Sequence, residues 1–177
     1  MKLKLDLHTH CCEATRLVYH PDIDLVREIV AAIKARGLDG IAITEHEDKE
    51  YGYRVKEIVE RYLNNEVLII PGQEKAVAEM GWAEVVELYL PDGGTFRFLA
   101  HPCYPYPGES TPGIDSLHGI EIGNALHDRQ LDKKKIRTIA EKYDLLLLQN
   151  SDAHCLSDIG SLYNEIDLEE LSARAAR

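Results

Sequence analysis

Two pairs of potential metal ligands lie near opposite ends of the chain. The segment DLHTH places His8 and His10 two residues apart, and the segment SDAH places Asp152 and His154 at the same spacing. Side chains alternate along a β-strand, so residues two positions apart point to the same side. Each pair could therefore offer two ligands to one ion, because imidazole and carboxylate groups suit zinc, manganese or iron.

Three further residues of ligand type follow apolar runs in the middle of the chain. They are His46 in TEHED, Glu74 in PGQE and His101 in AHP. A single histidine in such a place more often caps or packs the chain. Here five separate runs end in a ligand-type residue, and two of them end in a same-face pair, which favours a metal site. The set has too few oxygen ligands for calcium.

The elements that must position these residues alternate between strands and helices. The apolar patterns predict strands at 2–9, 39–45, 66–74, 83–90, 96–102, 119–124 and 145–152. They predict helices at 21–37, 51–65, 131–144 and 168–177. The sequence PDGG between the fourth and fifth strands predicts a hairpin or a short irregular link.

This alternation predicts an α/β fold with a mostly parallel sheet and helical cover. Seven strands favour a distorted (β/α)7 TIM-like barrel. The suspected ligands all lie at or just after the carboxyl ends of strands, so the metal site is expected at the carboxyl-terminal mouth. No GxGxxG follows the first strand, which argues against dinucleotide binding. No repeat or linker divides the chain, so residues 1–177 are expected to form one domain.

Charge and composition restrict the partners. Acidic residues outnumber basic ones by 31 to 20, and the net charge of −11 argues against a duplex DNA surface. A phosphorylated substrate remains possible at one site, because bound cations reverse the local field. No apolar run is long enough to cross a bilayer and no leader is visible, so a cytoplasmic protein is expected. The four cysteines form no CxxC pair and are expected to be small thiols near the site.

Five motifs carry a resemblance to a known family. DLHTH, ITEH, GQE, LAHP and SDAH, in this order, resemble the polymerase and histidinol phosphatase (PHP) superfamily from Asp6 to His154. Its members are distorted seven-stranded barrels with two or three metal ions at the mouth, and most characterised ones hydrolyse phosphoesters. The resemblance implies hydrolysis of a small phosphomonoester, or of a nucleotide or oligonucleotide end, by a metal-bound hydroxide. The resemblance implies two or three divalent ions, with zinc, manganese or iron as the metal. The expected partner is a small phosphorylated substrate or a single-stranded nucleic acid end.

The resemblance also implies a role for each candidate ligand. His8, His10 and Asp152 would hold the most buried ion, Glu74 would bridge two ions, His101 would bind the second, and His46 and His154 the third. Catalysis is expected to depend on Asp152, His154 and Glu74.

Three departures from the family pattern concern the second and third ions. Glu45 stands where the family usually has aspartate, and the longer side chain is expected to reposition His46. A family histidine after the bridging glutamate is missing, so Glu84 either substitutes for it or the ligand is absent. A residue shortly after HxH often completes the third site, and the candidates are Glu13 and, less favoured, His20.

Other interpretations remain open. The departures also fit a catalytically silent metal-binding module that acts in protein interaction or regulation. A binuclear hydrolase of C–N bonds is a third reading, disfavoured by the lack of an evident carboxylated-lysine position. His118 and His127 are minor candidates for protonating a leaving group. Tyr104 and Tyr106, in a proline-rich loop, could stack on a substrate base or pack the loop onto the barrel.

Overall fold

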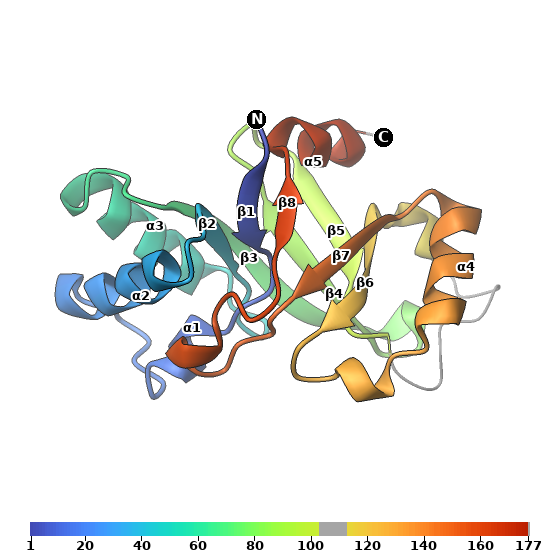
Figure 1. The fold of residues 1–177 in the computed structure, drawn as a ribbon, viewed down its shortest axis with the longest axis horizontal. Helices are drawn as coiled ribbons and strands as arrows, with labels where there is room; N and C mark the ends of the chain where they lie inside the picture. Colours follow the sequence, from blue (N-terminus) through green and yellow to red (C-terminus); the bar gives the residue numbers. More distant parts are fainter. Residues whose placement is uncertain (103–112, 177) are drawn as a thin grey trace.

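Eight strands form a single curled sheet in this computed structural model, which describes residues 1–102 and 113–176 (Figure 1). Neighbouring strands follow the order β7-β6-β5-β4-β3-β2-β1-β8. The strands are β1 (Leu3–Asp6), β2 (Gly40–Ile43), β3 (Leu68–Val77), β4 (Ala83–Tyr89), β5 (Thr95–Leu99), β6 (Gly119–Asn124), β7 (Leu146–Asn150) and β8 (Asn164–Ile166).

The predicted α/β barrel-like class is confirmed, and all seven predicted strands are present. The sheet is mixed, because β4 runs antiparallel to both β3 and β5. The PDGG turn does form a hairpin between β4 and β5, in which the Asp92 carboxylate accepts the Gly94 N–H at 3.0 Å. The reversed β4 brings its amino-terminal end, with Glu84, to the mouth, beside the carboxyl ends of the other strands.

The eighth strand, β8, is an addition that the apolar pattern did not indicate. It pairs antiparallel with β1 and lies between β1 and β7 at the end of the barrel away from the mouth. Asn164 makes this link, because its side chain exchanges hydrogen bonds with both backbone groups of Gln149 and donates to the Leu5 carbonyl. At the mouth β1 and β7 meet directly, since the Asp152 N–H donates to His8 O and the His10 N–H to Ala153 O, each at 2.9 Å.

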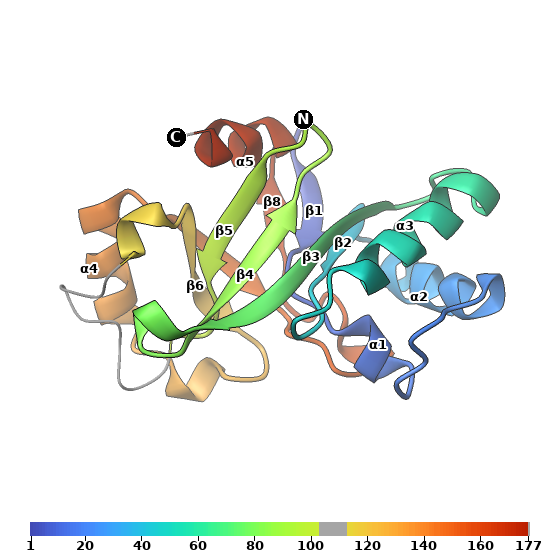
Figure 2. The ribbon, with the colours of Figure 1, turned by 180° about the vertical axis from the view of Figure 1, so that it is seen from behind.

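Two groups of helices flank the curled sheet on opposite sides of the molecule, as Figures 1 and 2 show. Helices α2 and α3 pack together on the side of β1 to β3, whereas α4 lies against β6 and β7. The α-helices are α1 (Cys11–Ala14), α2 (Ile23–Ala35), α3 (Glu50–Tyr62), α4 (Lys133–Tyr143) and α5 (Leu168–Ala175). Short 3₁₀ helices occur at Ala78–Met80, Ile114–Ser116, Asp128–Gln130 and Leu156–Asp158.

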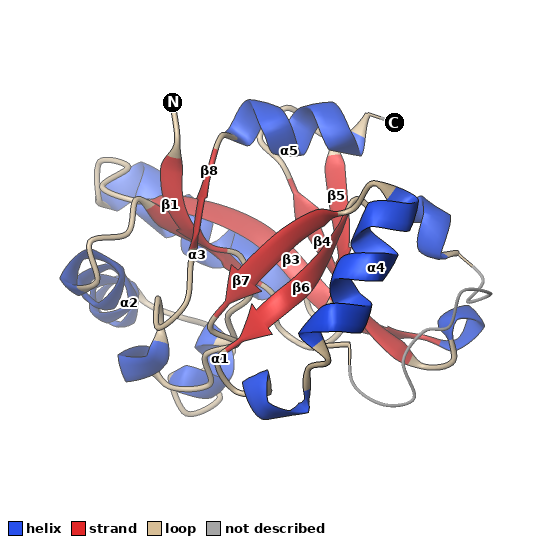
Figure 3. Cartoon of the chain, turned by 45° about the vertical axis from the view of Figure 1, so that its right-hand side comes forward, coloured by secondary structure: helices blue, strands red, loops and turns tan. Residues whose placement is uncertain are grey.

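Helix α5 closes one end of the barrel (Figure 3). Its Leu171 is fully buried in the same cluster as Leu5, Phe96 and Phe98, which fill the barrel interior. With apolar side chains at this end, the buried polar side chains collect toward the opposite end, at the mouth.

Two further expectations from the sequence concern the tyrosines of the proline-rich loop and the absence of membrane-spanning segments. Tyr104 and Tyr106 lie outside the described residues. In residues 1–102 and 113–176, the helices are too short or too polar to cross a membrane.

Candidate metal centre

All seven predicted ligands meet at the mouth of the barrel. His8, His10, His46, His101, Asp152 and His154 lie just after the carboxyl ends of β1, β2, β5 and β7. Glu74 reaches the same level because β3 continues past the end of β2 to pair with β4. An isolated bridge between His46 and Glu74 fixes this register. Tertiary structure thus brings together residues that the sequence separates by more than a hundred positions.

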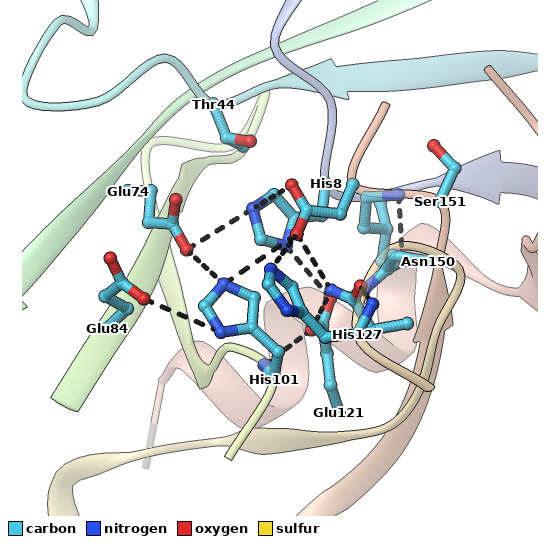
Figure 4. A network of polar contacts seen from close by, with 12 residues as sticks. His8, Thr44, Glu74, Glu84, His101, Glu121, His127, Asn150 and Ser151 are labelled. Atoms are coloured by element: carbon cyan, nitrogen blue, oxygen red, sulfur yellow. Dashed lines mark hydrogen bonds and ion pairs between the residues drawn. The ribbon is translucent and has the colours of Figure 1, made fainter. Parts of the chain in front are cut away.

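Glu74 lies at the centre of the group, and its two oxygens face different histidines. Figure 4 shows Glu74 beside His101. Its Oε1 lies 3.0 Å from His101 Nε2 and 3.4 Å from His8 Nε2. Its Oε2 lies 3.1 Å from His46 Nδ1 and 3.5 Å from His10 Nε2. A carboxylate in this position can contribute one oxygen to each of two ions.

The most buried cluster contains His8, His10 and Asp152. The two Nε2 atoms face each other at 3.1 Å, and Asp152 Oδ1 lies 3.5 Å from the first and 3.2 Å from the second. This Oδ1 is buried and forms no hydrogen bond of good geometry among the described residues. Buried ligand atoms that converge without satisfying one another fit a cation, so the donor set suits a divalent metal.

The electrostatics of this cluster point the same way. Burial opposes the charge on His8, but the carboxylates of Glu74 and Glu121 outweigh it and raise the pKa of His8. Burial, with the nearby His8, lowers the pKa of His10 to about 4. Burial acts against ionisation of Glu74 and Asp152, yet the surrounding histidines hold the pKa of each carboxyl well below its usual range. Such a pocket favours ionised carboxylates facing positive charge.

The outer cluster consists of His10, Glu13, His46 and His154, which correspond to the expected third site. Glu13 Oε1 lies 3.7 Å from His46 Nε2, and Oε2 lies 3.7 Å from His154 Nε2. Glu13, rather than His20, therefore completes this cluster. The side chains of Glu13, His46 and His154 are between 33 and 49% exposed, so this part of the site opens to solvent.

The side chain of Glu45, which was expected to reposition His46, forms its hydrogen bond at another place. Its Oε1 instead accepts the backbone N–H of Cys12 at 2.7 Å, in the short helix α1 that carries Glu13. Burial raises the pKa of the Glu45 carboxyl to about 7. The longer carboxylate thus holds α1 in place next to the outer cluster.

His127 is the residue that sequence reasoning undervalued. It follows β6, and its Nε2 lies 3.7 Å from Asp152 Oδ2, with its ring centroid 4.7 Å from that of His101. His101, His127 and Asp152 form a ligand cluster of their own. The GIEIGN strand was the available signal, because it ends three residues before His127, and a ligand-type residue after a strand matches the other strand ends.

Glu84 and His118 take other places. Glu84 Oε2 lies 3.6 Å from His101 Nδ1, the ring nitrogen opposite the one that faces Glu74. This arrangement favours an orienting contact over direct ligation. His118 precedes β6 at the far end of the barrel, where its Nδ1 accepts the N–H of Arg97.

The cysteines join none of these clusters among the described residues. Cys11 and Cys12 are buried free thiols that pack in the core beside α2, and Cys155 is exposed. Burial raises the pKa of Cys12 to about 11, so the thiol stays protonated at neutral pH. Cys103 lies outside the described residues.

Comparisons with known proteins agree with this fold. A family model described as PHP-associated matches residues 130–175. No curated protein sequence matches the chain. Among solved structures, the chain is similar to a candidate metal-dependent phosphoesterase from Bifidobacterium adolescentis, with a TM-score of 0.69, 15% identity and coverage of 96% of each chain.

Two other solved structures share the fold. PsfC from Pseudomonas syringae PB-5123 has a TM-score of 0.65 at 15% identity, covering 96% of this chain and 87% of that one. An amidohydrolase from Chromobacterium violaceum, with bound sulfate and no metal, has a TM-score of 0.62 at 14% identity, covering 96% of each chain. The family match at residues 130–175 bears out the predicted resemblance to the PHP superfamily, and the solved structures show a fold shared over nearly the whole chain.

Proposed function

We propose that this protein is a metal-dependent phosphoesterase. The observation that carries the proposal is the bridging position of Glu74, whose two oxygens face His101 and His8 on one side and His46 and His10 on the other. Among the described residues four overlapping clusters lie here, and within each cluster the ligand atoms are all within 4.8 Å of one another. Adjacent ion sites that share a carboxylate are the arrangement used to clamp a phosphoryl group.

Each residue then has a definite task. The most buried ion would be held by His8, His10, Glu74 and Asp152. The second ion would be held by Glu74 and His101, with His127 close to His101. Glu13, His46 and His154 would bind the third ion at the solvent edge. When bound, such ions lower the pKa of water to about 7 and neutralise phosphoryl charge. We propose two or three divalent ions per chain, with zinc, manganese or iron as the metal.

The proposed substrate is a small phosphomonoester or a single-stranded nucleotide end. The exposed outer cluster leaves the reacting end of such a molecule accessible, and the net charge of −11 disfavours binding along a duplex. His127 lies at the rim with an exposed fraction of 31%, and it could donate a proton to a leaving group if it does not bind the second ion.

Two other functions remain as outcomes of the test. Similarity in fold to an amidohydrolase favours a C–N bond as the alternative target. The silent-module hypothesis rested on Glu45 and Glu84. Two observations speak against it: Glu45 accepts a backbone N–H of α1, and His127 lies in a ligand cluster with His101 and Asp152.

The test combines metal analysis with hydrolysis of a generic aryl phosphate. Protein purified without chelator is compared with the double variant Asp152→Ala, His154→Ala and with a matched control, His20→Ala, Asp24→Ala, whose residues are exposed and join no cluster. We expect several ions per chain and turnover in the parent and control, and loss of both in the double variant. Bound metal without phosphoester turnover would redirect the search to C–N bonds or a silent module. A chain that stays metal-free after reconstitution would overturn the metal centre.

A further inference from the structure

Glu121 is a buried carboxylate directly behind the ligand clusters, yet it belongs to none of them. It lies in β6, and its side chain is fully buried. An ionised carboxylate in such a place is costly unless donors surround it. Burial works against its charge, but His8 and the other donors lower the pKa of the Glu121 carboxyl.

Four donors converge on the two oxygens of Glu121. Oε1 lies 3.0 Å from His8 Nδ1 and accepts from Asn150 Nδ2 at 2.7 Å. Oε2 accepts the backbone N–H of His101 at 2.7 Å and the side-chain amide of Asn124 at 2.9 Å. Figure 4 shows Glu121 between His8 and His101, on the side away from Glu74. One carboxylate therefore contacts a ligand of the buried site and the backbone of a ligand of the second site.

We propose that Glu121 is a positioning residue that couples these two ion sites. The inference rests on the metal centre of the proposed function. Because a carboxylate can only accept, it holds a proton on Nδ1 of His8, so the neutral ring that metal binding requires has its Nε2 lone pair directed at His10, Glu74 and Asp152. The same carboxylate holds the chain at His101, so a displacement of Glu121 moves ligands of both sites.

Asn124 extends this support to two further residues of the clusters, Asp152 and His127. Its Nδ2 group donates to Glu121 and also approaches Asp152 Oδ2 at 3.2 Å. Its Oδ1 accepts the backbone N–H of Leu126 at 3.1 Å and of His127 at 2.9 Å. The Glu121–Asn124 pair thus reaches His8, His101, Asp152 and the turn that carries His127.

The variant Glu121→Gln tests the charge and the acceptor count while keeping the shape. A glutamine amide has one acceptor oxygen, so whichever way it turns, its NH₂ group faces two donors. We expect binding of Zn²⁺ or Mn²⁺ to weaken by about 10- to 100-fold, which is typical when a partner behind a metal ligand is lost. The visible absorption bands of the Co²⁺-substituted protein should shift, because the ligand geometry changes.

The matched control is Glu87→Gln, the same substitution at another largely buried carboxylate. The side chain of Glu87 is 14% exposed, accepts a hydrogen bond from Gln73 and pairs with Lys75 and Arg97, and it lies outside the clusters. We expect this variant to lose thermal stability and keep metal affinity within about threefold, inside the usual context dependence of such effects. Equal weakening in both variants would mean that general loss of stability, and not positioning, explains the result.

A measurement on the parent protein keeps the proposal testable if Glu121→Gln fails to fold. ¹⁵N NMR of the metal-loaded protein should show His8 with its proton on Nδ1 and metal on Nε2. A proton on Nε2 of His8, or unchanged metal affinity in a folded Glu121→Gln variant, would overturn the positioning role. Failure of the parent to bind metal would instead reject the metal centre itself, so the two failures are distinguishable.

Discussion

His8 Nε2 and His10 Nε2 point at each other across 3.1 Å, and Asp152 Oδ1 lies within 3.5 Å of both. The two ring nitrogens cannot both carry protons at this distance without repulsion. The pKa of His8 is raised and that of His10 is lowered to about 4, so the pair is arranged to share one positive charge. A divalent ion satisfies the three atoms together, which leads to the first prediction.

Removal of metal should destabilise the fold. An ion that binds only the folded state adds about 2.7 kcal/mol to the free energy of unfolding when its free concentration is about a hundred times Kd. We expect EDTA to lower the melting temperature and stoichiometric Zn²⁺ or Mn²⁺ to restore it, measured by differential scanning calorimetry. Unchanged melting in the presence of EDTA, with metal removal verified by elemental analysis, would contradict this.

Replacement of His127 by asparagine should weaken the second ion site selectively. His127 contributes to the cluster with His101 and Asp152 but not to the other three. We expect the affinity for one ion to fall by about tenfold or more, and phosphoester turnover to fall with it, because ligand removal disrupts the metal geometry. The measurement is a metal titration followed by calorimetry.

The control for that variant is His118→Asn, the same substitution at the opposite end of β6. It should leave the titration unchanged. A His127→Asn protein with the parental number and affinity of ions would show that His127 does not bind metal, and would favour its use in proton donation.

Shortening Glu45 to aspartate should loosen α1 and the outer cluster. The Glu45 carboxylate reaches Cys12 N at 2.7 Å, and aspartate is one methylene too short to keep this hydrogen bond from the same backbone position. We expect a loss of about 1 kcal/mol in the free energy of unfolding, typical of one buried hydrogen bond. The affinity of the outer cluster for its ion should also fall, since Glu13 lies in the same helix.

Glu47→Asp is the matched control for this prediction. Glu47 is exposed and lies two residues further along the chain. Its replacement by aspartate is the same change in side-chain length. Urea unfolding and metal titration of both variants give the comparison. Equal effects in the two proteins would argue against a specific role for the Glu45–Cys12 hydrogen bond.

His118 should make stability fall at low pH. Burial, Arg97 and Arg174 lower the pKa of His118 below its ordinary value of 6.5. Below that value the unfolded chain binds a proton at this position more readily than the folded chain does. The free energy of unfolding therefore decreases as the pH falls from 6.5, and it is unaffected by His118 well above 6.5.

The variant His118→Asn isolates this contribution. The asparagine Oδ1 can accept the Arg97 N–H in place of Nδ1 without a titrating group. Urea unfolding at about pH 7.5 and about pH 5 should show a smaller loss of stability in the variant than in the parent. Titration of the metal-centre histidines is common to both proteins and cancels in the difference. Identical losses would mean that His118 does not contribute.

Local patterns along the chain were enough to predict most of the fold. The apolar patterns placed seven strands and four helices, because periodicities of two and 3.6 residues are local properties of the chain. They missed α1, which has four residues, and β8, which has three, because such segments are too short to show a period. The pairing of β8 depends instead on Asn164 and on strand β1, far away in sequence.

The sequence also identified the candidate ligands, since HxH and DxH spacing puts two side chains on one face of an extended chain. What it could not determine was which residues from distant strands share a cluster. Only the curled sheet brings His127 to His101, Glu45 to Cys12 and Glu121 to His8. These contacts depend on strand register and barrel closure, which are properties of the assembled sheet and leave no periodic signal in any one segment.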